Sequence, residues 1–227
     1  MILAVAQHQL RPTPAQDLEA LVGAAASATA RGARIVVLPA VAAVQEGPLS
    51  EELWRRLDEA VPGGTVVMLA APGVYGGYSQ VCEIAPLGRV ALLLGDAAID
   101  VGALPDVARQ SPAVAVVSAQ AESELQAEAF LELAIGLSTS LAALVVVVEA
   151  DGATMGEAGH GGSAVLHLGE VLAEAVGGDD LLVVDVEAPV GPPEPRGPLP
   201  ELPPLLAQRL AAHRGQKLRV DYPADLD

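Results

Sequence analysis

Three aspartates lie close together in the middle of the chain, at Asp96, Asp100 and Asp106. Carboxylates at such short spacing can bind a cation, or can divide the acid and base roles of a reaction between them. The same stretch contains glycine, and charged side chains are rarely buried without a partner. A solvated loop is therefore the simpler interpretation of these three residues, and the one that the sequence favours.

The chain has a single thiol and four scattered histidines. Cys82 falls in an expected strand, where a small buried cysteine usually packs without reacting. None of the histidines has a metal-ligand partner two or four positions further on. His8 and His167 lie in expected strands and are interpreted as hydrogen-bonded or surface residues. The sequence therefore predicts no metal site and no bound cofactor.

His160 stands in a glycine-rich loop, directly before Gly161, Gly162 and Ser163. A histidine in such a loop near a pocket can be functional, and the run is similar to the oxyanion-hole loop of esterases. The nucleophile motif G-x-S-x-G that should accompany that loop is absent, because the nearest candidate, 136–140, lacks its final glycine. The sequence also lacks the G-x-x-x-x-G-K-[ST] and G-x-G-x-x-G phosphate-binding motifs. An ordinary loop residue is the favoured interpretation of His160.

Composition limits the class of protein and its partners. Hydrophobic residues make up 52% of the 227 residues, which is enough to build a large core in one domain. The formal net charge of -17 repels phosphate groups, so neither nucleic acid nor an anionic membrane is expected as a partner. The N-terminus does not resemble a signal peptide, and the one cysteine fits a reducing compartment. These features predict a cytoplasmic protein without a transmembrane segment.

Strands and helices alternate along the chain, with two hairpins among them. Apolar runs predict strands at 1–9, 34–38, 65–71, 78–85, 89–94, 114–118, 143–149, 163–167, 171–175 and 181–186. Helical spacing predicts helices at 15–31, 50–60, 122–137 and 205–213, and a further helical segment that begins at 105–109. We expect an α/β layered fold with a mixed sheet, in a domain over 1–188 that is followed by a Pro-rich tail over 189–227.

Four pieces of the sequence, in this order, resemble the nitrilase superfamily of carbon–nitrogen hydrolases. The opening "ILAVAQHQL…DLEALVGAAASATARGARIVVLPA" is similar to that family's first strand, helix and second strand. "YSQVCEIAPLGRV" resembles its hairpin, and "LPDVARQSPAVAVVSA" resembles the stretch after its nucleophile. "GHGGSAVLHLGEVLAEAVGGDDLLVVDVE" resembles the closing module. The resemblance implies a four-layer α-β-β-α sandwich with two mixed sheets. It also implies a homodimer, in which the C-terminal tail of one chain can reach over its partner.

The family hydrolyses amides or nitriles with a Glu as acid and base, a Lys that stabilises negative charge, and a Cys as nucleophile. The resemblance places the glutamate after the proline of the second strand, where this chain has Ala40. A methyl group cannot transfer a proton. Glu46 lies six residues further on and could replace the glutamate only if its loop folded inward.

The other two members of the triad are also missing from their expected places. The lysine should follow the first hairpin, but the only lysine is Lys217, and Arg89 is interpreted as a surface turn residue. The nucleophile falls at Ile99 when counted back from Pro105 and Asp106, and at Gly95 when counted forward from the hairpin. Neither residue is a nucleophile, so no catalytic residue is assigned.

Three hypotheses follow. The first is a degenerate nitrilase-fold protein without hydrolase activity that acts by binding or assembly. The second is an active carbon–nitrogen hydrolase with rearranged groups such as Glu46, Asp96 or Asp100, and His160, which must then converge in one pocket. The third is an unrelated α/β protein. The sequence names no ligand or partner protein.

Overall fold

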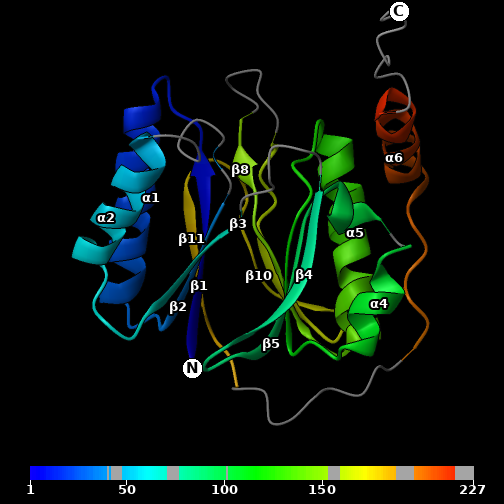
Figure 1. The fold of residues 1–227 in the computed structure, drawn as a ribbon, viewed down its shortest axis with the longest axis horizontal. Coiled ribbons are helices and arrows are strands. Elements are labelled where there is room, and N and C mark those ends of the chain that lie inside the picture. The colour runs from blue at the N-terminus through cyan, green and yellow to red at the C-terminus, as the bar shows by residue number, and fades with distance from the viewer. Residues whose placement is uncertain are drawn as a thin grey trace, which may run out of the picture.

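Two β-sheets pack face to face at the centre of the molecule (Figure 1). The computed structural model describes residues 1–39, 41, 48–70, 77–100, 102–152, 159–187 and 197–217. The first sheet has the order β11-β1-β2-β3, and β8 pairs with β1 beside it. Its strands are β1 Ile2–Gln9, β2 Ile35–Pro39, β3 Val66–Ala70, β8 Ala150–Asp151 and β11 Asp180–Asp185.

The second sheet has the order β10-β9-β7-β6-β5-β4. Its strands are β4 Gly77–Ile84, β5 Gly88–Gly95, β6 Val114–Ser118, β7 Leu144–Val147, β9 Ala164–His167 and β10 Glu170–Glu174. Strands β5, β6 and β7 are parallel, whereas β4 and β5, and β9 and β10, form antiparallel hairpins. In the first sheet β1 is parallel to β2 and antiparallel to β11. Both sheets are therefore mixed, as expected.

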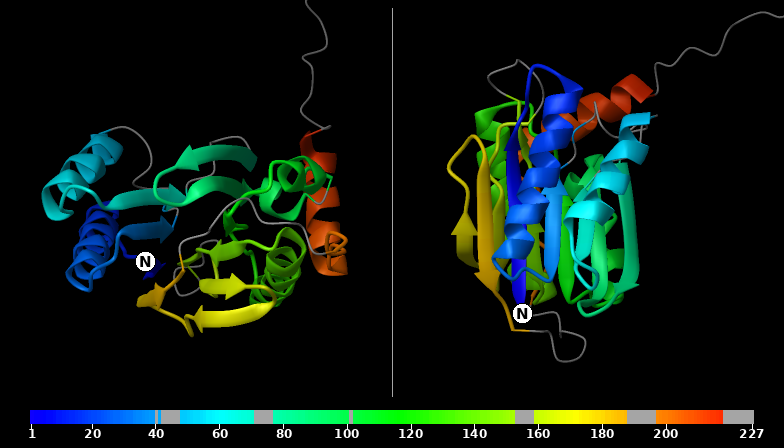
Figure 2. Two further views of the ribbon diagram at one scale, coloured as in Figure 1. Left: turned by 90° about the horizontal axis from the view of Figure 1, so that it is seen from below. Right: turned by 90° about the vertical axis from the view of Figure 1, so that its left-hand side faces the viewer.

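Helices cover the outer face of each sheet (Figures 1 and 2). On the first sheet lie α1 Pro14–Ala30 and α2 Pro48–Ala60. On the second lie α3 Asp96–Ile99, α4 Leu104–Arg109 and α5 Glu124–Leu141, and α6 Pro204–Lys217 packs against α5 and α3. The order of layers is thus helix, sheet, sheet, helix, which confirms the four-layer sandwich and excludes the unrelated α/β arrangement.

The apolar runs of the sequence form the core because both faces of the central strands are covered. Strands β2 and β6 are buried along their whole length, as is usual for parallel strands between two layers. Between the sheets, Val5 and Val37 of the first face Val116 and Val146 of the second within one apolar cluster. Two further clusters join each sheet to its helices. Small and branched aliphatic side chains thus fill a core with very few aromatic residues.

The C-terminal segment packs against the outer face of α5. Leu206 and Leu210 of α6 belong to the same buried cluster as α5. Ahead of α6, the hydroxyl group of Ser140 donates a hydrogen bond of 2.6 Å to the carbonyl oxygen of Pro198. The chain passes so close to α5 that a Cβ atom on Gly136 would lie 2.7 Å from the Cβ atom of Pro200. A glycine at position 136 is what permits this approach.

The start of one helix differs from the sequence-based expectation, because α2 begins at Pro48 and not at residue 50. Proline is well suited to the first turn of a helix, because its missing N–H has no partner there. The four-residue helix α3 and the two-residue strand β8 were not predicted, since neither is long enough to give a periodic pattern. Within the described residues, no helix combines the length and the hydropathy needed to cross a membrane.

Candidate functional site

The turn between β5 and α3 has the geometry in which hydrolases present a nucleophile. Gly95 ends the strand and directly precedes the helix, with φ 61° and ψ -138°. Side chains other than hydrogen strongly disfavour this region of backbone conformation. In hydrolases, a sharp strand-to-helix turn of this kind exposes the nucleophile at the end of the sheet. Here the residue at the turn has no side chain and can offer no nucleophile.

The second candidate position, Ile99, lies at the other end of α3 and is fully buried. It belongs to the apolar cluster between the second sheet and its helices, together with Leu104 and Leu206. The structure therefore assigns Ile99 to the core and leaves Gly95 as the residue at the strand-to-helix turn.

The remaining triad positions lie at or beyond the edge of the described residues. Strand β2 ends at Pro39, and Ala40 and Glu46 fall outside the described residues. Lys217 is the last residue of α6, and its side chain is also outside the description. Arg89 is exposed, and its guanidinium group donates to the carbonyl oxygen of Gln110 at 2.5 Å. Arg89 is therefore a surface residue, as expected, but it lies on strand β5 and not in the turn.

The aspartates after β5 occupy turn and surface positions. The carboxylate of Asp100 accepts a hydrogen bond of 3.0 Å from the amide of Gly102, two residues further along. Asp106 is exposed on α4 and forms an ion pair with Arg109 in the next turn. Asp96 begins α3, and its side chain lies outside the described residues. Asp106 is thus exposed to solvent, as the simpler interpretation expected, but it lies on a helix and not in a loop.

Cys82 is on the hairpin strand β4, as expected, but it is only half-buried. The prediction of a buried core cysteine is wrong, because within the described residues β4 pairs with β5 alone and lies at the edge of the second sheet. Its sulfur lies 3.8 Å from the carbonyl oxygen of Val90 on β5. Nothing in this position brings Cys82 to the turn at Gly95.

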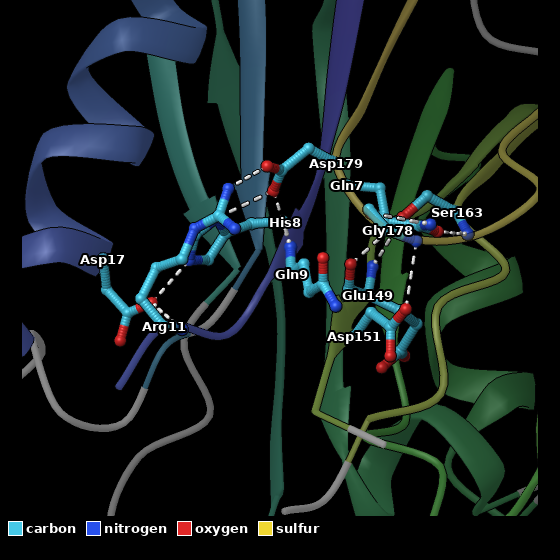
Figure 3. A network of polar contacts seen from close by, with 10 residues as sticks. All are labelled: Gln7, His8, Gln9, Arg11, Asp17, Glu149, Asp151, Ser163, Gly178 and Asp179. Carbon is cyan, nitrogen blue, oxygen red and sulfur yellow. Dashed lines mark hydrogen bonds and ion pairs between the residues drawn. The ribbon is translucent and has the colours of Figure 1, made fainter. Parts of the chain in front are cut away.

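The histidines differ in burial and contacts. His8 is 3% exposed, and its Nε2 lies 2.6 Å from the Oδ1 atom of Asp17. Its Nδ1 lies 3.4 Å from Asp179, which also forms an ion pair with Arg11 (Figure 3). His167 is exposed at the end of β9. Both therefore have the hydrogen-bonded or surface positions expected from the sequence.

His160 is half-buried and forms an isolated β-bridge with Asp151. The turn that follows is closely packed, because a Cβ atom on Gly161 would lie 3.1 Å from the side-chain amide of Gln7. Gly161 also donates its amide to the carbonyl oxygen of Ala150 at 3.1 Å. Glu46 lies outside the described residues, so the convergence with His160 that the second hypothesis requires is not tested.

A chain of buried polar contacts links the two sheets at the carboxyl ends of β1 and β7 (Figure 3). The amide of Glu149 donates to the Ser163 hydroxyl at 2.9 Å, and that hydroxyl lies 3.2 Å from the carbonyl oxygen of Glu149. The amide of Ser163 donates to the side-chain oxygen of Gln7 at 2.9 Å. Gln7 in turn donates to the carbonyl oxygen of Gly178 at 3.2 Å. These bonds satisfy buried polar groups and fix the end of the sandwich.

Glu149 is the ionisable group that the sequence analysis missed. It is 2% exposed, and its carboxylate accepts hydrogen bonds from the amides of Ala119 at 2.6 Å and Gln120 at 3.1 Å. Burial raises the pKa of this carboxyl to about 7, although the two amides, the Ser118 hydroxyl and the charge of Arg209 act to lower it. A glutamate directly after four valines was the only signal in the sequence.

The peptide groups of Ala119 and Gln120 form hydrogen bonds with both Arg209 and Glu149. Arg209 of α6 is 8% exposed and donates to the carbonyl oxygen of Ala119 at 2.7 Å and to that of Gln120 at 3.2 Å. Glu149 accepts from the amides of the same two residues. Gln120 has a φ of 51°, a conformation that is uncommon for residues other than glycine. The C-terminal helix thus contributes directly to the polar end of the sandwich.

A carboxyl group with a pKa near 7 can exchange protons at neutral pH. The carboxylate of Glu149 is shielded from solvent, because it is buried and accepts hydrogen bonds from two backbone amides. Among the described residues, no cluster of three or more His, Cys, Asp and Glu side chains could hold a metal ion. The described part of the site therefore offers a buried proton-accepting group, with the hydroxyl groups of Ser118 and Ser163 beside Glu149.

Comparison with known proteins gives the class of fold. No family model matches the sequence, and no curated protein matches it. Solved structures do match, and among them are forms of an amidase of the nitrilase superfamily from Nesterenkonia sp. AN1. The form in complex with butyramide is 18% identical, with a TM-score of 0.67, over 96% of each chain. Another form is 17% identical, with a TM-score of 0.65, also over 96% of each chain. The chain therefore has the nitrilase-superfamily fold, as the resemblance implied.

Proposed function

We propose that this chain is a nitrilase-fold protein that does not hydrolyse amides or nitriles and acts by binding or assembly. The observation that carries the proposal is Gly95, which occupies the strand-to-helix turn where hydrolases place a nucleophile and which has no side chain. The amidase from Nesterenkonia sp. AN1, by contrast, has an active-site cysteine to which acrylamide adds. Without an attacking group, a covalent route to amide hydrolysis has no first step.

Two further features of the sequence support the loss of activity. The second strand is followed by Ala40 where the resemblance implies a glutamate, and no lysine precedes Lys217. These positions lie in separate segments, so one error of alignment does not account for all of them. Removing even one member of a catalytic set that acts as a unit usually lowers the rate by orders of magnitude.

One observation favours the alternative, an active hydrolase with rearranged groups. Glu149 has a pKa of about 7, in the range suited to proton transfer at neutral pH. In this alternative a water molecule, activated by the carboxylate, would replace the missing thiol. The enclosure of Glu149 by the amides of Ala119 and Gln120 argues against access for such a water.

Ammonia release from butyramide and acrylamide separates the two functions. We expect the purified protein to release no more ammonia than buffer alone, while the Nesterenkonia amidase serves as the positive control. Turnover that persists through repeated purification and is abolished in Glu149→Gln would overturn the proposal. Glutamine keeps a side-chain oxygen that can accept hydrogen bonds from the amides of Ala119 and Gln120. The substitution therefore removes proton transfer while the local structure is retained.

We also propose a cytoplasmic location and a homodimer. The single cysteine is consistent with a reducing compartment, and the pairing of chains follows from the resemblance alone. Light scattering of the purified protein measures the mass in solution. Twice the chain mass of 23.0 kDa is the expected result, and the mass of one chain at micromolar concentration contradicts it.

A further inference from the structure

Exposed apolar side chains gather around one strand of the second sheet. Of the six large hydrophobic residues that are exposed in the described part of the chain, four lie in or beside β10. They are Leu168, Val171, Leu172 and Val176, with exposed fractions of 37%, 42%, 44% and 99%. Single exposed hydrophobic residues are common on protein surfaces, but a contiguous group of them often marks an interaction site.

Strand β10 is an edge strand. Within the described residues it pairs with β9 alone, so the outer side of its backbone has no strand beside it. Figure 2 shows β10, in yellow, at the outer margin of the sandwich in both views. The pairing with β9 shifts by one residue between Val171 and Ala173, which leaves Leu172 at a bulge. An exposed edge of this kind is a template for another extended segment.

The surroundings of β10 are acidic. Glu170 and Glu174 begin and end the strand and are exposed, and the exposed Asp180 follows it, whereas Asp179 forms an ion pair with Arg11. No lysine or arginine lies between Arg109 and Arg196 in the sequence. Opposite charges across a strand pair are favourable and like charges are unfavourable. Antiparallel pairing with a second copy would place Glu170 near Glu174 of that copy, so charge disfavours self-pairing and favours a basic partner.

We propose that β10 and its exposed apolar neighbours Leu168 and Val176 form a docking site for an extended peptide segment in which basic and apolar residues alternate. The segment adds to the second sheet as a further strand, with its main chain bonded to β10. Successive residues of a strand face opposite sides of the sheet, so its basic side chains pair with Glu170 on one side and its apolar side chains contact Val171 on the other. This inference rests on the proposed binding role and deepens it by naming a class of partner.

A synthetic peptide of alternating lysine and valine, about ten residues long to match a strand, is the probe. We expect it to bind the full chain and to slow amide hydrogen exchange in residues 170–174 by about tenfold or more, since strand addition gives those amides new partners. The control peptide has the same charge but carries proline at its central valine, which removes a main-chain donor. It should bind at least several-fold more weakly.

Two lysine substitutions of exposed residues locate the binding. Val171→Lys should weaken binding of the lysine–valine peptide by about tenfold, the effect typical of a central interface residue. Leu125→Lys is the matched control, because Leu125 is 66% exposed on α5, away from β10, and should leave binding unchanged. Equal losses from both variants, equal binding of the proline peptide, or absence of protection at 170–174 each overturn the proposal.

The same protein sample separates this inference from the proposed function. Failure of the peptide to bind, with no amide turnover, removes the docking site and leaves the non-catalytic role standing. Amide turnover together with peptide binding at β10 removes the non-catalytic role and leaves the docking site standing.

Discussion

Glu149 is a buried acid, and its surroundings favour the neutral, protonated form over the charged form. Burial is the largest influence on its pKa, and it outweighs the two amides, the Ser118 hydroxyl and the charge of Arg209. The result is a carboxyl with a pKa of about 7 in the folded chain, compared with 4.5 for the free group. Its protonation state therefore changes within the range of pH at which proteins are usually studied.

The stability of the fold should fall as pH rises through this range because of Glu149. Below about pH 4.5 the group is protonated in both the folded and the unfolded chain. Between about 4.5 and 7 the unfolded chain releases the proton first, so deprotonation favours unfolding, and above about 7 the loss levels off. The full loss is about 3 kcal/mol at 1.4 kcal/mol per pKa unit.

Glu149→Gln isolates this contribution, because glutamine stays neutral at every pH. Urea unfolding at pH 4, 6 and 8 should give wild-type and variant chains of similar stability at pH 4. At pH 8 the free energy of unfolding of the variant should exceed that of the wild type by up to about 3 kcal/mol. A difference between the two that is the same at all three pH values contradicts the raised pKa.

Among the structural elements, the C-terminal segment depends on one glycine of α5. Gly136→Ala adds a Cβ atom 2.7 Å from the Cβ of Pro200, which is closer than these atoms can pack. We expect a loss of about 1–2 kcal/mol, as for other overpacked sites. Gly23→Ala in α1 is the matched control, because no atom lies within 4 Å of the new Cβ. It should stabilise the chain by up to about 1 kcal/mol through helix propensity.

Thermal or urea unfolding of both alanine variants measures these effects. If Gly136→Ala stabilises the chain as much as Gly23→Ala does, the segment at 197–203 does not lie against α5.

Arg209 is the second attachment of the C-terminal segment. Arg209→Met keeps much of the side-chain volume but leaves the carbonyl groups of Ala119 and Gln120 without their donor and removes a charge near Glu149. The expected loss is about 3 kcal/mol in the free energy of unfolding. Arg109→Met, which removes an exposed ion pair with Asp106, should change stability by less than about 0.5 kcal/mol. Similar effects of the two substitutions in urea unfolding contradict a buried role for Arg209.

The long elements could be predicted from sequence, and the contacts between distant segments could not. Apolar runs such as RIVVL and VAVVS are buried strands because both of their faces are covered. A continuous apolar run of this length can be recognised in the sequence without knowledge of distant contacts. The role of Glu149 depends on amides 29 and 30 residues earlier in the chain, at Gln120 and Ala119. Nothing in the local pattern brings those groups together, so only the assembled sheet reveals the buried acid.

The candidate site was predicted in part for the same reason. Counting along the sequence left Gly95 and Ile99 as equal candidates for the nucleophile position. The structure places Gly95 at the strand-to-helix turn and Ile99 in the core, a difference that the sequence does not reveal. Cys82 was expected in the core, but the position of β4 at the sheet edge leaves it half-buried, and strand order is a property of the whole sheet.

At the scale of the whole molecule, the four layers have the nitrilase-superfamily fold, and our proposal is that the turn at Gly95 lacks the nucleophile that hydrolysis requires. The polar end of the sandwich is instead closed by hydrogen bonds that join β1, β7 and the C-terminal helix. On this account, the fold serves as a rigid support for binding, and its surface carries the function.

Covalent capture by fluoroacetamide tests the missing nucleophile most directly, because the acetamide moiety of this compound adds to the active-site cysteine of the Nesterenkonia amidase. The protein to use is Cys82→Ser, which removes the only thiol of the chain. After prolonged incubation, intact-mass measurement should show an unchanged mass. A one-to-one adduct, mapped by peptide sequencing to any residue at the carboxyl end of the strands, would contradict the central claim that this nitrilase fold has no nucleophile.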